Sequence, residues 1–286
     1  MATTRTRFHS RIAIFVLSCL PFGFSNDAAA EDERISFFGL RPLPGHSTTS
    51  AHDVSDDGSV VVGTSIGMND QRRGFRWPKN AGMASLGWSG NYEANAVSAD
   101  GSVVVGDVLA GSGWAFRWTV QSGLLTSLGT LPGGGWSSAS DVNADGSVVV
   151  GVSDVPGPCH AFRWTASGGM VDLGTLPGHS YSSAGGVSAD GSVVVGYSVS
   201  FASVPPAWRG FRWSQAEGMV ELPGTVDFSR HLALRTSGDG SNIAGIVYPS
   251  GADHRACVWR GNKKLTNLGT LPLHWSAWAG SIPGGL

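Results

Sequence analysis

The stretch SASDVNADGSVVVGVSDVPGPCHAFRWTASGGMVDLGTLPG, residues 138–178, decides the fold. The Asp-Gly pair at 145–146 is typical of a hairpin turn, because both residues tolerate positive φ angles. The three valines that follow predict a strand buried on both faces. In Phe162-Arg163-Trp164 the two rings share one face of a strand, where we expect both to be buried, and the arginine points to the other face. The stretch therefore predicts four short strands, at 138–143, 147–153, 160–165 and 170–176.

The same pattern recurs along the chain. Five Asp-Gly turns stand at Asp57, Asp100, Asp145, Asp190 and Asp239. An aromatic-Arg-Trp triplet and a Leu-Gly-Thr-Leu-Pro element follow in a fixed order, although the fifth triplet reads Cys257-Val258-Trp259. A repeated unit of this size with four strands is typical of a propeller blade. The glycine after the valines, Gly151 here, suits a bulge or a close backbone approach.

We predict an all-β protein: a β-propeller of four-stranded blades, with about five complete repeats and partial end units. A β-solenoid is the alternative, but its strands pair in parallel between copies, whereas an Asp-Gly turn indicates antiparallel hairpins within each copy. Lone strands are expected at 35–43 and near 276–281. The predicted units are 45–85, 86–127, 128–172, 173–221 and 222–267, with a partial unit at 268–286.

The first thirty residues are typical of a signal peptide. Arg5, Arg7 and Arg11 precede an apolar stretch at 12–24 that is too short to span a bilayer as a helix, and small residues follow at 28–30. We predict cleavage near Ala30, leaving residues 31–286 as one repeat domain. The expected location is secreted, at the cell surface or in the periplasm, with no transmembrane segment in the mature chain.

The composition excludes several function classes. Charged residues are only 14%, the net charge is −2, and hydrophobic residues are 41%. A basic footprint for nucleic acid is therefore absent, and a packed core is expected. No Gly-x-Ser-x-Gly elbow, phosphate loop or zinc motif occurs. Acidic residues outside the turns are scattered and follow no repeat. We therefore predict no catalytic residues, no enzyme activity and no cofactor.

One segment has the spacing of a calcium loop. Asp141, Asn143 and Asp145 place oxygen atoms at alternate positions before a glycine, as hard cations require. The twelfth position holds Val152 instead of an acid, and the other units replace the first aspartate in most copies. We favour an Asp-Gly turn with local hydrogen bonds.

The connection between the second and third strands varies most from unit to unit. It covers 198–209 in the fourth unit and 154–158 in the third. Equivalent loops of a propeller emerge on one rim, so we expect any ligand to meet this rim. Aromatic and proline residues are the candidate contacts: Trp114, Pro205, Pro206 and Trp208. The partner is unknown, with an extracellular glycan or protein as the expected class.

The motifs resemble the HAF family of extracellular repeats, named for a His-Ala-Phe triplet that stands here at 160–162. The likeness covers residues 36–272, although other pairs replace His-Ala in the remaining units. The resemblance implies an exported bacterial protein and brings no catalytic residues. We therefore predict a non-catalytic binding or surface scaffold. The alternatives are a hydrolase or lyase acting on extracellular polysaccharide and a calcium-stabilised structural module.

Overall fold

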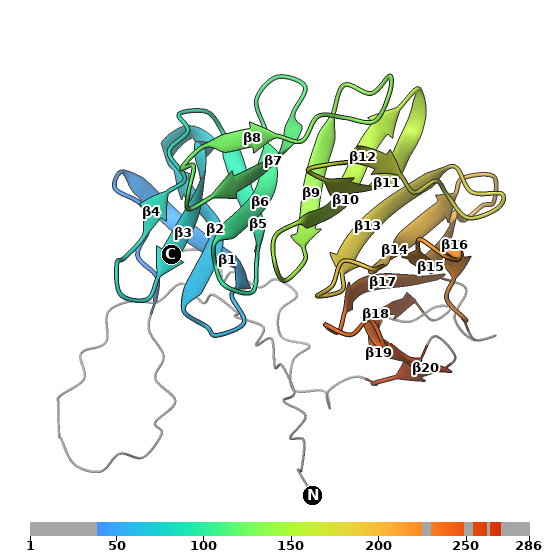
Figure 1. Cartoon of the computed structure of the whole chain (residues 1–286). Coiled ribbons are helices and arrows are strands. Elements are labelled where there is room, and N and C mark those ends of the chain that lie inside the picture. The colour runs from blue at the N-terminus through green and yellow to red at the C-terminus, as the bar shows by residue number, and fades with distance from the viewer. Residues whose placement is uncertain (1–38, 225–229, 249–253, 262–263, 270–286) are drawn as a thin grey trace, which may run out of the picture. The chain divides into compact units, whose positions relative to one another are not determined.

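The computed structural model describes residues 39–224, 230–248, 254–261 and 264–269 (Figure 1). Their regular structure is β-strand, apart from one short 3-10 turn, Met68–Asp70 (η1). The chain divides between Asp172 and Leu173 into two compact units. The predicted signal peptide, and the predicted end unit beyond residue 269, lie outside the described residues. Of the predicted strand at 35–43, the described residues 39–43 are not strand.

The described residues of the two units form five four-stranded sheets. Those of the first unit are β1 (His46–Val54), β2 (Val60–Gly67), β3 (Arg72–Pro78) and β4 (Ala84–Ser85); β5 (Tyr92–Val97), β6 (Val103–Val108), β7 (Trp114–Thr119) and β8 (Leu125–Ser127); and β9 (Ser137–Val142), β10 (Val148–Val155), β11 (Gly157–Thr165) and β12 (Gly169–Asp172). Those of the second unit are β13 (Tyr181–Val187), β14 (Val193–Ser200), β15 (Ala207–Ser214) and β16 (Gly218–Glu221); and β17 (Arg230–Thr236), β18 (Asn242–Tyr248), β19 (Arg255–Arg260) and β20 (Lys264–Asn267).

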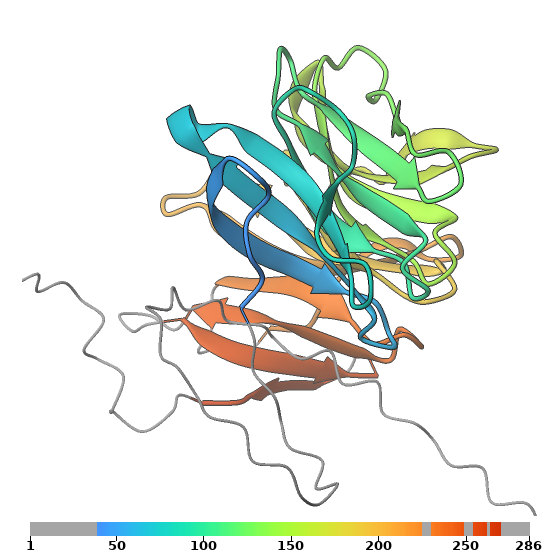
Figure 2. The same ribbon diagram turned by 90° about the vertical axis from the view of Figure 1, so that its left-hand side faces the viewer.

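Each sheet is an antiparallel meander whose strands follow chain order, which confirms the predicted four-stranded blade and excludes the parallel pairing of a solenoid. Neighbouring sheets pack through their first strands. In the first unit β5 lies against β2 and β3, and β9 lies against β6 and β7 (Figure 1). In the second unit β17 lies against β13, β14 and β15; Figure 2 shows its sheet in orange and red.

The five Asp-Gly turns close the first hairpin of each sheet, as predicted. In the first, Gly58 has a φ of +71°. Asp57 accepts hydrogen bonds from the Ser59 amide at 2.9 Å and the Ser55 hydroxyl at 2.7 Å, while the Ser55 Oγ accepts one from the Val60 amide. The Ser59 amide, together with the Ser55 and Ser59 hydroxyls, lowers the pKa of Asp57 to about 2.

The glycine after the valines makes a close backbone approach, as its place in the repeat predicts. A Cβ on Gly151 would lie 2.0 Å from the Ser138 carbonyl oxygen and 2.9 Å from the Phe162 ring. Opposite it, the register of β9 shifts by one residue at Ser140, which is a β-bulge. The same approach recurs in the other four sheets, at Gly63, Gly106, Gly196 and Gly245.

The arginine of the triplet joins neighbouring sheets. Arg76 Nε donates to the carbonyl of Gly101, in the Asp-Gly turn of the next sheet, at 3.0 Å. Arg117 Nε donates to Gly146 at the same distance one sheet further on. Because the head groups are engaged in the protein, the repetition of this arginine in the first unit has a structural reason.

The aromatic core departs from the prediction at one point. Phe162 and the valines Val148–Val150 are buried, as expected, but Trp164 is only half-buried. The phenylalanine ring already covers Gly151, so the tryptophan lies at the margin of the core. In the last sheet Cys257 replaces the phenylalanine.

The space above Gly245 in that last sheet is filled by Trp259, which is fully buried. The Trp259 Nε1 donates to the Pro223 carbonyl at 2.8 Å. In this sheet the Trp259 ring therefore takes the place that the phenylalanine ring occupies in the other four.

The Leu-Gly-Thr-Leu-Pro element is not part of the fourth strand. In the third sheet β12 ends at Asp172, short of the predicted residue 176, because Gly174 adopts a φ of +71°. In the first unit this element connects two sheets: the Leu128 amide donates to Ala115 and the Leu131 amide donates to the Ser153 hydroxyl. Both leucines are buried, so the element links and covers neighbouring blades.

Candidate functional site

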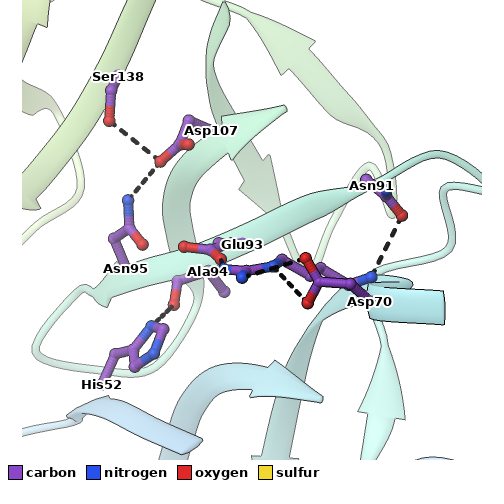
Figure 3. Close-up of polar contacts among 9 residues, drawn as sticks. His52, Asp70, Asn91, Glu93, Ala94, Asn95, Asp107 and Ser138 are labelled. Atoms are coloured by element: carbon purple, nitrogen blue, oxygen red, sulfur yellow. Dashed lines mark hydrogen bonds and ion pairs between the residues drawn. The ribbon is translucent and has the colours of Figure 1, made fainter. Parts of the chain in front are cut away.

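A polar cluster in the first unit draws residues from β1, η1, β3, β5, β6 and β9 (Figure 3). Arg72, on β3, forms an ion pair with Glu93 on β5 and a second one with Asp70 at 3.3 Å. The Arg72 amide also donates to the Asn91 side chain at 3.2 Å. His52, in the bulge of β1, bonds through Nδ1 to the Ala94 carbonyl at 2.8 Å.

Asp107 is the most buried acid of this cluster. Its Oδ1 accepts from Asn95 Nδ2 at 2.7 Å and from the Ser138 hydroxyl at 3.0 Å, so it joins β6 to β9 of the next sheet. Burial raises the pKa of Asp107, and the nearby Glu93 charge adds to the rise. Glu93 and Asp107 are register partners across β5 and β6, so two carboxylates in different environments stand side by side.

Sequence reasoning missed this pair because neither acid repeats. Asp107 follows the strand glycine, where the other units have Thr64, Val152, Tyr197 and Ile246. A single acid at a position held mostly by apolar residues was the available signal.

An aromatic row lies in the second unit, and it is the second candidate site. Tyr181 and Tyr197 stack with ring centroids 6.1 Å apart, and Tyr197 stacks on Trp208 at 5.3 Å. Phe201 extends the row by an edge contact with Tyr181 at 6.5 Å, and 56% of its surface is exposed. At the other end Arg230 lies over the Trp208 ring.

The predicted contact residues fall into separate groups. Trp208, the second residue of β15, belongs to the aromatic row, and the exposed Pro205 and half-buried Pro206 lie in the connection just before it. Trp114, the first residue of β7, belongs to the first unit, where it makes an edge contact with Trp88 at 6.1 Å. The structure therefore brings Trp208 together with four residues that the sequence did not single out: Tyr181, Tyr197, Phe201 and Arg230.

Two of the variable connections are shorter than the sequence suggested. In the fourth sheet β14 and β15 pair as far as Ser200 and Ala207, so the loop is 201–206, not 198–209. In the third sheet Val155 pairs with Gly157, which leaves only Pro156 between the strands. Backbone pairing extends beyond the repeated sequence pattern because it does not depend on side-chain identity.

The residues of the calcium-loop spacing make turn contacts. Asp145 Oδ1 accepts from the Ser147 amide at 2.9 Å, and Asn143 Oδ1 accepts from the Val148 amide at 2.8 Å. Asp141 is buried in β9. Across the described part of the chain, no group of three His, Cys, Asp or Glu side chains is arranged to hold a metal ion.

His231, on β17, is a buried titratable group that follows Arg230 in the chain. Its Nδ1 accepts a hydrogen bond from the Gly210 amide at 3.0 Å, which requires that nitrogen to be unprotonated. Burial, together with the Arg209 charge, lowers the pKa of His231 to about 4. The Glu221 carboxylate lies 3.9 Å from Nε2 of His231 but forms a closer ion pair, 3.1 Å, with Arg209. The effect of burial on the pKa of His231 is therefore larger than that of Glu221.

This contact predicts an acid-sensitive link between β15 and β17. The pKa of His231 lies below its unfolded value of about 6.5, so the stabilisation is complete above that pH and is lost as the pH falls through about 4. The loss should approach about 3 kcal/mol. Urea unfolding from pH 7 to 4 measures it. His231→Asn should flatten the pH dependence, whereas His254→Asn, at an exposed position, should leave it unchanged. Equal slopes in wild type and His231→Asn would contradict the assignment.

No protein-family model matches the chain, and no curated protein matches it. Solved structures do. TolB from Acinetobacter baumannii is 16% identical with a TM-score of 0.51, over 74% of this chain and 51% of that one. A putative TolB from Agrobacterium tumefaciens is 12% identical with a TM-score of 0.54, over 78% and 81%. The β-propeller domain of the Trilobed protease from Pyrococcus furiosus, described as having an open velcro topology, is 12% identical with a TM-score of 0.51, over 78% and 71%.

These likenesses and the five antiparallel meanders define the class: the chain is a β-propeller. It spans about half the length of the Acinetobacter TolB. Sequence identities this low support a shared fold and not a shared activity, so the function has to come from the residues of this chain. In the part of the chain that the structure describes, no helix has the length and apolar character needed to cross a membrane.

Proposed function

We propose that the chain is an exported, non-catalytic β-propeller that binds an extracellular glycan or protein through its blade loops. The charged, apolar and small-residue succession in residues 1–30 supports export with cleavage near Ala30, to the exterior, the cell surface or the periplasm. The resemblance of the repeats to the HAF family supports the same location. The two TolB structures and the Trilobed protease propeller support the fold, and the function is argued from the residues.

The aromatic row of the second unit is the observation that carries the proposal. Its central rings are half-buried and its end ring, Phe201, is exposed. Rigid aromatic side chains give large contact areas at low entropic cost, which is why binding surfaces are rich in them. The row also borders the 201–206 loop, the longest described connection between second and third strands.

A second candidate, a hydrolase or lyase, rests on the juxtaposed Glu93 and Asp107. A carboxyl group with a raised pKa beside an ionised one is an arrangement that acid–base catalysis uses. Here, however, both carboxylates are engaged by the protein: Glu93 by Arg72, and Asp107 by Asn95 and Ser138. The contacts of Arg72 and Ser138 link strands of neighbouring sheets, which favours a structural role for both acids.

Loop replacement tests the binding proposal. Residues 201–206 are replaced by Asn-Gly, which suits a two-residue hairpin between β14 and β15. On a glycan and protein array the variant should lose at least tenfold in affinity for the wild-type ligand. The matched control makes the same replacement at 109–113, between β6 and β7, and should bind as wild type. Unchanged binding by the 201–206 variant, with its melting transition intact, would contradict the proposed surface.

A further inference from the structure

Arg230 makes cation–π contacts with two aromatic rings. It is the first residue of β17 and the register partner of Tyr248 on β18. Its guanidinium carbon lies 5.3 Å from the centroid of Trp208, in the neighbouring sheet, and 5.1 Å from that of Tyr248. The cation therefore lies over both rings, which attract it through their negative faces.

The charge of Arg230 has no acidic partner among the described residues. Every ion pair that the described chain forms involves other cations, and Arg230 donates no hydrogen bond within it; its Nε is buried without a partner. By contrast, the nearby Arg209 is paired with Glu221 at 3.1 Å. A partly buried, permanently charged group is costly unless it meets an anion, so the arrangement is suited to an external one.

The chemistry of the guanidinium restricts the class of anion. Its N–H groups lie in the plane of the group and form a fixed fork. A planar carboxylate matches the fork with two parallel hydrogen bonds, a geometry that lysine cannot supply. The site thus suits a carboxylate that lies in the plane of the guanidinium, beside the aromatic row.

The row indicates what bears the carboxylate. From Trp208 through Tyr197 and Tyr181 to Phe201, successive rings are 5.3–6.5 Å apart, so the surface is extended. Tyrosine combines an apolar ring with a hydroxyl tip, as sugars combine apolar faces with hydroxyl groups. We propose that this surface binds an acidic polysaccharide, with Arg230 receiving the carboxylate of a uronic acid. The inference rests on the proposed binding function and names its ligand class.

Calorimetric titration of the exported chain with a galacturonic acid hexamer tests the proposal. The methyl ester of the hexamer keeps the sugar chain and removes the charge, so it should bind at least tenfold more weakly. Arg230→Gln should bind the acid hexamer as weakly as wild type binds the ester. Arg230→Lys keeps the charge and loses the planar fork. The logarithm of its affinity ratio for acid over ester should therefore be about half the wild-type value. Arg260→Gln, exposed at the opposite end of the same sheet, should stay within twofold of wild type.

Several outcomes would overturn the inference. The inference fails if the wild-type chain binds the acid and the ester with equal affinity. It also fails if Arg230→Gln melts as wild type and binds the acid hexamer with wild-type affinity. Tighter binding of hexaglutamate than of the hexamer would mean that an acidic peptide is the ligand. If the hexamer does not bind while the array returns another ligand that depends on residues 201–206, the inference fails and the proposed function stands. If neither surface binds anything, both fail.

Discussion

Replacing Gly151 with alanine is expected to lower the free energy of unfolding by about 3 kcal/mol. The added methyl group would lie 2.0 Å from a backbone oxygen of β9 and 2.9 Å from the Phe162 ring, and neither neighbour can yield cheaply. The oxygen is held in a paired strand, and the ring is fully buried. Urea unfolding followed by tryptophan fluorescence measures the loss.

Gly135→Ala is the matched control for this prediction. Gly135 precedes β9, the strand that Gly151 approaches, but a Cβ there meets nothing within 4 Å and its φ is not positive. Its stability should remain within about 0.5 kcal/mol of wild type. If Gly151→Ala lowered the free energy of unfolding as little as Gly135→Ala, the close backbone approach at the bulge would be contradicted. The same result would remove the explanation for the glycine at this position of every unit.

The tryptophans of the third and last sheets are expected to differ in their contribution to stability. Trp259→Ala should cost about 3–5 kcal/mol, because a fully buried ring is lost and the Pro223 carbonyl loses its donor. Trp164→Ala removes a half-buried ring and should cost about 2 kcal/mol. Both are measured by urea unfolding.

The contrast between these two variants is informative because they occupy the same position of the repeat. The pattern alone predicts equal costs. Cys257→Phe sharpens the test: it restores the residue of the other four units, yet it should destabilise by about 1–3 kcal/mol, because Trp259 already fills the space. Stabilisation by Cys257→Phe would show that the last sheet packs like the others.

The fold was predictable because its determinants are local and repeated. Asp-Gly turns, valine runs and the strand glycine each act within one hairpin. Each of the five copies therefore predicts the same structure independently of the others. The half-buried Trp164 was not predictable, since its exposure depends on how much space the neighbouring phenylalanine leaves. The extent of the 201–206 loop was missed for a related reason, because strand pairing continues through residues without a pattern.

The candidate sites were predictable only in part. Trp208 was identified from its place near a variable loop. Arg230 was not, because its environment comes from β15 and β18, and neither ring lies within fifteen residues of it in the sequence. Likewise Glu93 and Asp107 are fourteen residues apart and meet only through the register of β5 and β6. Sites built across strands from residues that do not repeat leave little trace in a repetitive sequence.

Hydrogen–deuterium exchange with and without the bound ligand tests the central claim most directly, because it separates the two candidate sites in one experiment. Binding through the aromatic row predicts slower exchange in 197–208 and 230–248, with residues 91–108 unchanged and the ligand recovered intact. Protection confined to 91–108, around Glu93 and Asp107, or recovery of a cleaved ligand, would contradict the account.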